Sequence, residues 1–275
     1  RVSPAGSRRR ILALGGGGFT SSAEDWPLDE LTASLTSRPT PRICLLPTAS
    51  GDPEEQIRRF YAAFEPLGCE LSHISLFRLG THPVNLREHL LSRDVIYVGG
   101  GSLLNLLALW HVHGVDALLC EAWQLGVALC GVSAGSMCWF EAGVTRTYGR
   151  PSVASGLSLL RGSNSVHYGG DPVRRAAYRS AVAEGIPGGY AVEDGVALLF
   201  AGQELVDVVS SRPGARAYRV QLDGGALAER PLEAREIARP PGSLPSAPVS
   251  LVEFREAAQR RSRASRNSLR SIPPV

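Results

Sequence analysis

Short apolar runs and longer amphipathic segments alternate along the first half of the chain. The apolar runs have the length of buried strands and fall at residues 9–18, 42–50, 69–77, 94–102 and 125–132. Segments with helical spacing fall at residues 52–68, 85–92 and 103–126. We expect Asp52 to cap the first helix and Gly68 to follow its end, and Gly114 to divide the last segment into two helices. Strands that alternate with helices favour a mostly parallel sheet covered on both faces.

The pattern changes beyond about Gly156. Residues 171–185 have helical spacing, but residues 190–211 and 215–234 alternate like antiparallel strands, with turns at Gly202 and at residues 223–225. From Arg239 onward, proline, arginine and serine predominate. The sequence therefore predicts an α/β/α sandwich with C-terminal antiparallel strands. It would form one catalytic domain at residues 1–237, followed by a loosely held tail at residues 238–275.

Composition and charge exclude several classes of protein. The net charge of +3 is small for 275 residues, and much of the excess lies at residues 8–10 and 255–270, which argues against a nucleic-acid-binding protein. No run approaches ~18 apolar residues, so we expect no membrane span. The five cysteines include no C-x-x-C pair, which favours buried, reduced thiols in a cytoplasmic protein.

Small residues follow three of the predicted strands. They are Gly15–Gly18, Gly99–Gly101 and Gly131–Ser133. Ligands of open parallel sheets bind at the carboxyl ends of the strands, so these segments should converge on one site. The last of them begins GVSAG, which fits the G-x-S-x-G turn that holds a nucleophilic serine between a buried strand and a helix. Ser133 is therefore the candidate nucleophile.

A nucleophilic serine needs a base and an acid that orients the base. Of the six histidines, His167 lies in a polar, glycine-rich connection, where functional residues are common. His111 and His113 are two positions apart on a helix and do not share a face, so the sequence predicts no metal site there. Asp194 is the preferred acid, and its neighbour Glu193 is the alternative.

The order serine, histidine, acid differs from the order serine, acid, histidine of α/β-hydrolases. It matches class I glutamine amidotransferase-like folds. The chain also resembles the dipeptidase E (aspartyl dipeptidase) and cyanophycinase family of serine peptidases over residues 11–211. The resemblance runs in order through the motifs ILALGGGGF, CLLPTAS, DVIYVGGGSLLNLL, GVSAGSMCWFEAG, VHYGGDPVRRAAY and YAVEDGVALLF.

The resemblance implies specific roles. Ser133 would be the nucleophile, His167 the general base and then acid, and Asp194 the triad acid where the type enzyme has Glu. The N–H groups of Gly100 and Ala134 would form the oxyanion hole. Substrate-binding positions implied by the family are Gly101, Ser102, Arg174 and Arg175.

Two features bear on the substrate. The chain has GGGS where aspartyl-specific relatives commonly have GGGNT, so Ser102 replaces an asparagine. An arginine near the catalytic histidine holds the acidic side chain of the substrate in that family, and Arg174 or Arg175 could supply it. Adjacent arginines on a helix are also often only a solvated face. The expected partner is a small peptide substrate, and the mechanism requires neither cofactor nor metal. The sequence does not decide whether the protein forms a homodimer.

Other functions remain as alternatives. The same machinery would serve an esterase or amidase acting on a non-peptide acyl group, or a cyanophycinase-like hydrolase. A nucleotide or anion binder could use GGGGFT, but this run is not a complete G-x-G-x-x-G because Thr20 takes the last position. A cysteine-nucleophile amidotransferase is disfavoured, because Cys130 lies within the strand and Ser133 occupies the turn.

Overall fold

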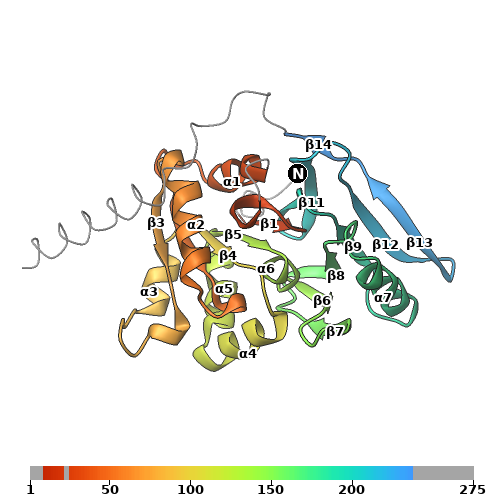
Figure 1. Cartoon of the computed structure of the whole chain (residues 1–275), viewed down its shortest axis with the longest axis horizontal. Helices are drawn as coiled ribbons and strands as arrows, with labels where there is room; N and C mark the ends of the chain where they lie inside the picture. Colours follow the sequence, from red (N-terminus) through yellow and green to blue (C-terminus); the bar gives the residue numbers. More distant parts are fainter. Residues whose placement is uncertain (1–8, 22–24, 238–275) are drawn as a thin grey trace, which may run out of the picture. The chain divides into compact units, whose positions relative to one another are not determined.

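The computed structural model describes residues 9–21 and 25–237, whose strands form two sheets (Figure 1). The first sheet has eight strands in the order β14-β11-β10-β1-β5-β4-β2-β3. Its strands are β1 (Arg10–Leu14), β2 (Arg42–Leu46), β3 (Glu70–His73), β4 (Val95–Val98), β5 (Ala128–Val132), β10 (Val196–Ala201), β11 (Glu204–Ser210) and β14 (Arg235–Glu236). The pairs that link β1, β5, β4, β2 and β3 are parallel, whereas β10 is antiparallel to β1 and β11. The predicted α/β fold with a mostly parallel sheet is confirmed.

Helices cover both faces of the first sheet, because successive residues of a strand point in opposite directions. Leu12 of β1 packs in one cluster with Phe60, and Ile11 packs in another with Trp110. The helices are α1 (Trp26–Ala33) and α2 (Glu54–Phe64) on the first face, and α3 (Leu86–Leu91), α4 (Leu103–His113) and α5 (Val115–Gln124) on the second. Gly114, with φ of 67°, separates α4 from α5 as predicted.

A second sheet is the main difference from the expected fold. It has six strands in the order β13-β12-β9-β8-β6-β7. They are β6 (Phe140–Thr145), β7 (Ser152–Ser155), β8 (Leu160–Val166), β9 (Gly189–Val192), β12 (Ala217–Asp223) and β13 (Ala226–Leu232). The expected C-terminal antiparallel strands are thus divided, since β10 and β11 join the first sheet and β12 and β13 extend the second. Helix α7 (Pro172–Ala183) packs on β12 and β13, and Figure 1 shows this group at the end of the molecule remote from β3.

Two local predictions were wrong for tertiary reasons. Helix α2 begins at Glu54 rather than beyond an Asp52 cap, because Asp52 has φ of 56° and its carboxylate accepts hydrogen bonds from Ser75 Oγ (2.6 Å) and the Phe77 N–H (3.3 Å). The predicted strand at residues 69–77 ends at His73 and is followed by a turn of 3-10 helix at Leu76–Arg78. The predicted tail at residues 238–275 lies outside the described residues.

No single helix within residues 9–21 and 25–237 has the length and apolar content to cross a membrane. In this part of the chain, only α4 and α5 taken together have that length and apolar content, and these two helices are bent by 87° at their junction.

Candidate active site

Ser133 lies on a strained turn between β5 and α6 (Ala134–Met137), with φ of 57° and ψ of −113°. The turn is tight enough to require the flanking glycines. A methyl group on Gly131 would lie 2.0 Å from the Gly135 carbonyl oxygen, and one on Gly135 would lie 2.3 Å from the Val98 carbonyl oxygen. Non-glycine residues seldom hold such a conformation unless the surrounding structure imposes it, and it projects the side chain beyond the end of the sheet.

The structure brings Ser133, His167 and Asp194 into hydrogen-bond contact. Ser133 Oγ lies 2.9 Å from Nε2 of His167, and Nδ1 of His167 lies 2.5 Å from Oδ1 of Asp194. His167 directly follows β8 and has φ of 54°, a conformation that is also unusual for a non-glycine residue. The arrangement can pass a proton from the hydroxyl to the imidazole while the carboxylate stabilises the resulting imidazolium.

Asp194 is held in its charged form. The hydrogen bond with His167 lowers the pKa of the Asp194 carboxyl below its ordinary value, against the opposing effect of burial. The charges of His167, Arg212 and Arg174 lower this pKa further. A carboxylate that stays ionised at neutral pH can orient the His167 ring and stabilise the imidazolium.

The adjacent acid, Glu193, points to a different part of the molecule. Its carboxylate accepts hydrogen bonds from the Arg216 N–H (2.9 Å) and the Tyr218 hydroxyl (3.1 Å), both near the start of β12. Between the two neighbouring acids, only Asp194 has a hydrogen bond with His167 in the described structure. Glu193 instead fastens the end of β9 to the start of the neighbouring strand β12.

The glycine run after β1 has a packing role next to these residues. A methyl group on Gly16 would lie 2.1 Å from Asp194 Oδ1 and 3.0 Å from Cε1 of His167. The Gly16 carbonyl also accepts a hydrogen bond from the Gly195 N–H at 2.9 Å. The absence of a side chain at Gly16 therefore lets β1 approach the histidine and the acid closely, which accounts for a glycine at this position of the run without a bound nucleotide.

The segment after β4 lies against the serine. A methyl group on Gly100 would lie 3.2 Å from Ser133 Cβ and 3.8 Å from Ser133 Oγ. Gly101 has φ of 143°, and a methyl group there would lie 2.2 Å from the Ala49 carbonyl oxygen. Ala134, the first residue of α6, is fully buried. The backbone of Gly100 and the residue after the serine thus lie on either side of the nucleophile.

Ser102 makes structural contacts. Its Oγ accepts a hydrogen bond from the Asn105 N–H at 3.1 Å, which caps α4. The same hydroxyl donates to Thr147 Oγ1 at 3.3 Å, and Thr147 in turn lies 3.1 Å from Thr145 Oγ1. The segment that joins β6 to β7 is thereby tied to the residue next to Gly101.

Arg174 and Arg175 have different surroundings although they are adjacent. Arg174 Nη1 donates to the carbonyl of Val166, the residue before His167, at 3.2 Å, and burial lowers the pKa of its guanidinium. Arg175 forms an ion pair with Glu229 and stacks on the rings of Tyr168 (4.9 Å) and Tyr218 (5.4 Å). Arg174 is therefore turned toward the histidine, and Arg175 toward the β12–β13 hairpin.

Sequence analysis missed a group beside Asp194. Arg212, Ser211 and Asp25 form a buried hydrogen-bonded cluster next to Gly195. Arg212 and Asp25 are 187 positions apart, and neither lies in a recognisable motif. Only the fold brings them together.

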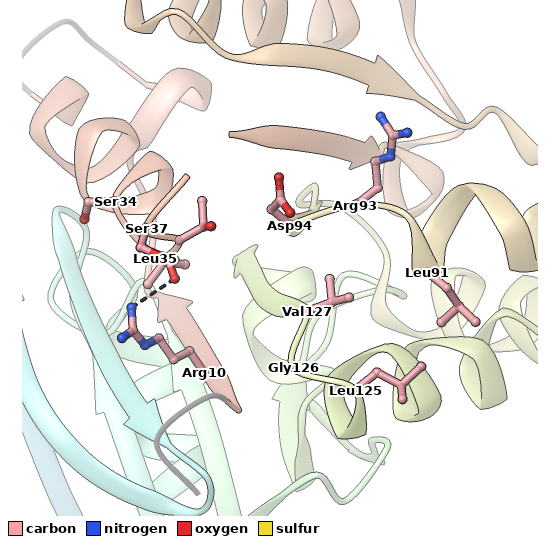
Figure 2. A pocket seen from close by; sticks show the side chains of 11 residues that line it. Arg10, Ser34, Leu35, Ser37, Leu91, Arg93, Asp94, Leu125, Gly126 and Val127 are labelled. Atoms are coloured by element: carbon pink, nitrogen blue, oxygen red, sulfur yellow. Dashed lines mark hydrogen bonds between the residues drawn. The ribbon is translucent and has the colours of Figure 1, made fainter. Parts of the chain in front are cut away.

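A cavity of about 520 Å³ lies away from these residues. It opens at the amino ends of parallel strands, where Arg10 begins β1 and Asp94 and Val127 precede β4 and β5 (Figure 2), whereas Ser133 follows the carboxyl end of β5. The carboxylate of Asp94, in the wall of this cavity, accepts hydrogen bonds of 2.9 Å to 3.1 Å from Arg42. Across the part of the chain that the structure describes, no group of three or more His, Cys, Asp or Glu side chains is arranged to hold a metal ion.

Comparisons with known proteins show the family to which the chain belongs. Residues 11–208 match peptidase family S51. The chain is 45% identical over 225 residues to the uncharacterized peptidase YgaJ of Bacillus subtilis (strain 168), an alignment that covers 82% of this chain and 97% of that protein.

Two solved structures share the fold. The crystal structure of a peptidase from an acI-B1 Actinobacterium has a TM-score of 0.59 at 18% identity, and covers 82% of this chain and 94% of that one. A putative peptidase E protein from Listeria monocytogenes EGD-e has a TM-score of 0.54 at 20% identity, with 74% and 98% covered. The family match covers residues 11–208, and the alignment with YgaJ covers 97% of that relative. This chain is therefore a member of peptidase family S51, the dipeptidase E and cyanophycinase family of serine peptidases.

Proposed function

We propose that this peptidase hydrolyses short peptides through an acyl-enzyme, with Ser133 as nucleophile, His167 as general base and then acid, and Asp194 as the acid that orients His167. The observation that carries the proposal is the pair of hydrogen bonds of 2.9 Å and 2.5 Å that joins the three side chains on a strained turn. The order of the three residues along the chain also supports a class I glutamine amidotransferase-like fold.

The chemistry follows from this geometry. Ser133 Oγ attacks the scissile carbonyl while its proton passes to Nε2 of His167, and a tetrahedral oxyanion forms. His167 then gives the proton to the leaving amine as the C–N bond breaks, which leaves an ester on Ser133. Water attacks this ester with His167 again as the base, so the acid product leaves and the hydroxyl is restored. The route requires neither a metal nor an organic cofactor.

The oxyanion would be held by the N–H groups of Gly100 and Ala134. Gly100 is close enough to Ser133 that a methyl group on it would lie 3.2 Å from Ser133 Cβ, and Ala134 follows the nucleophile directly. One such donor typically stabilises the transition state by about 3–4 kcal/mol. Gly101, whose φ of 143° favours glycine, would set the conformation of this loop.

The substrate we favour carries an acidic side chain. Arg174 and Arg146 both pair with Asp171, at 3.5 Å and 2.9 Å, so these three charges leave one positive charge near His167. Arg174 is the candidate for reading a substrate carboxylate, because its guanidinium lies against the Val166 carbonyl next to His167, whereas Arg175 is directed to Glu229. Ser102 would border the same space and differs from the asparagine of aspartyl-specific relatives. Dipeptides of the Asp-X type are therefore the first substrates to test.

The same machinery would also serve an esterase or amidase, or a cyanophycinase-like hydrolase of a branched aspartyl polymer. No feature of the site favours these over short peptides. The buried free cysteines, Cys44, Cys130 and Cys138, suit a cytoplasmic location.

Hydrolysis of a panel of dipeptides and aminoacyl-anilides tests the proposal, with Ser133→Ala as the blank. The panel should pair each acidic residue with its amide, so Asp-anilide is compared with Asn-anilide and Glu-anilide with Gln-anilide. We expect Asp-anilide to be cleaved with the highest kcat/KM and the blank to be inactive. Cleavage of ester analogues without cleavage of any peptide or anilide would contradict the peptidase assignment and favour the esterase.

A further inference from the structure

The turn between β9 and β10 carries Asp194 and is held in place by hydrogen bonds of the next residue, Gly195. Gly195, with φ of 80°, donates its N–H to the Gly16 carbonyl at 2.9 Å. Its carbonyl accepts hydrogen bonds from the Ser211 N–H at 2.8 Å and from Ser211 Oγ at 3.1 Å. The peptide that follows Asp194 is thus attached to both the glycine run and the end of β11.

Arg212 lies across this turn. A methyl group on Gly195 would lie 2.6 Å from Cγ and 3.0 Å from Nε of Arg212, so the arginine stem packs directly on the glycine. The absence of a side chain at Gly195 therefore lets a cation approach the residue next to Asp194. The same glycine allows the positive φ of the turn.

A buried carboxylate fixes the guanidinium in this place. Arg212 Nε donates to Asp25 Oδ1 at 2.9 Å, and Nη2 donates to Asp25 Oδ2 at 2.5 Å. Asp25 is fully buried and also accepts a hydrogen bond from Ser211 Oγ at 2.8 Å. A two-point contact of this kind sets the orientation as well as the position of the guanidinium.

The charges around Asp194 come from several elements. His167 is hydrogen-bonded to Asp194 at 2.5 Å, and the charges of Arg212 and Arg174 also act on its carboxylate. Asp25 forms an ion pair with Arg212, and Glu193 accepts a hydrogen bond from the Tyr218 hydroxyl. Arg212 contributes to lowering the pKa of Asp194, after the hydrogen bond of His167 and the opposing effect of burial.

We propose that Arg212, anchored by Asp25, is a positioning residue for the triad acid: it holds the turn that carries Asp194 and supplies a positive charge beside the His167–Asp194 pair. The proposal rests on the function proposed above. A purely structural ion pair in the same place would contribute to stability but would leave the titration of the histidine unchanged.

The test follows the ring protons of His167 by NMR as the pH is varied, with the resonance assigned by its loss in His167→Gln. In Arg212→Met, a positive charge is removed, so the coupled pair binds a proton more readily. We expect the titration midpoint to rise by about half a pH unit or more. Arg235→Met is the matched control, because Arg235 also pairs with an aspartate, Asp207 on β11, but at an exposed site. The titration midpoint of His167 in Arg235→Met should equal that of the wild type.

Arg212→Lys separates charge from position. Lysine keeps the positive charge but cannot make the two-point contact with Asp25. We expect a midpoint close to the wild-type value, and kcat lowered by about fivefold or more with KM within about twofold. If Arg212→Met does not fold, Arg212→Lys decides the question, and wild-type kcat in that variant would overturn the proposal. An unchanged midpoint in a folded Arg212→Met would overturn it as well.

The NMR titration needs no substrate, so it stays informative if the proposed function fails. Absence of peptide hydrolysis by the wild type, or retained hydrolysis in Ser133→Ala, would refute the function and leave the titration result standing. A midpoint that does not move in an active enzyme would refute only the role of Arg212.

Discussion

Asp194 Oδ1 lies 2.5 Å from Nδ1 of His167, whereas the carboxylate of the preceding residue accepts its hydrogen bonds from Arg216 and Tyr218. These neighbouring acids thus have different roles, because both lie in the connection between β9 and β10 and their carboxylates contact different partners. One acid is available to orient the imidazole, and the other joins β9 to β12.

This division predicts different results for two conservative substitutions. Asp194→Asn should lower kcat by about 10³ to 10⁴-fold, because an amide cannot stabilise the imidazolium or fix the productive tautomer of His167. Glu193→Gln should keep kcat within about tenfold, because an amide oxygen can still accept the Tyr218 hydroxyl. Steady-state kinetics on the best substrate of the panel distinguishes them. Equal losses in the two variants would mean that the acid has been assigned wrongly.

The strained turn makes a prediction about stability. Gly135→Ala would place a methyl group 2.3 Å from the Val98 carbonyl oxygen, which belongs to the backbone of β4 and cannot move aside cheaply. We expect the free energy of unfolding to fall by about 3 kcal/mol, together with loss of activity. Gly80→Ala is the matched control, because a methyl group on Gly80 has no neighbour within 4 Å. Thermal and urea unfolding of the two variants measure the difference, and similar stabilities would contradict the packing described.

The two adjacent arginines should affect different properties. Arg174→Met should raise KM for Asp-anilide by about tenfold or more and leave KM for Asn-anilide little changed, because only the acidic substrate offers a carboxylate to the guanidinium. Arg175→Met should leave this preference intact. Its main effect should be a loss of about 1–2 kcal/mol in unfolding free energy, since Glu229 loses one of its partners. A preference for acidic substrates that survives in Arg174→Met would exclude Arg174 as the reader of the carboxylate.

Asp94, at the opposite edge of the sheet, should contribute stability that depends on pH. Burial alone would raise the pKa of this carboxyl, but the hydrogen bonds and charge of Arg42, with a smaller effect of the charge of Arg38, lower it below its ordinary value. A folded-state pKa below the unfolded value of about 3.9 means that the contribution is complete above that pH and is lost as the pH falls through the lower value.

The substitution Asp94→Asn measures this contribution. We expect it to lower the unfolding free energy by about 1–2 kcal/mol at pH 7, and the difference from the wild type to shrink as the pH falls below about 4. Chemical denaturation across a series of pH values follows it. A difference that stays constant down to pH 2 would show that packing, and not the ionised carboxylate, is responsible.

The sequence is informative where structure is determined locally. The alternation of apolar runs and amphipathic segments predicted the strands β1 to β5 and the helices α2 to α5, but it missed α1 between β1 and β2. The second sheet was not foreseen. The G-x-S-x-G turn predicted a helix after Ser133, but α6 is only 4 residues long. Beyond it, the Leu160 N–H bonds the Trp139 carbonyl at 2.9 Å, as Trp139 and Phe140 enter the core. The chain thus leaves the helix after one turn and enters the second sheet at Phe140.

The candidate site divides in the same way. Ser133 is marked by its flanking glycines, and the order of the motifs indicated His167 and a choice between two acids. The sequence favoured Asp194 over Glu193, but it could not show where each carboxylate points, because only the folded connection between β9 and β10 sets those directions. Arg212 and Asp25 left no signal, since their contact depends on β11 ending beside the glycine run.

The central claim is that Ser133 carries the reaction, and kcat/KM of Ser133→Ala on the best peptide substrate tests it most directly. Ser136→Ala is the control, because Ser136 lies in the short helix that follows Ser133, is fully buried, and accepts a hydrogen bond from Asn164 Nδ2 at 2.9 Å. We expect kcat/KM to fall by at least about 10⁴-fold in Ser133→Ala and to change by less than about tenfold in Ser136→Ala. The circular dichroism spectrum of Ser133→Ala should match that of the wild type. Activity in Ser133→Ala close to that of the wild type would contradict the account.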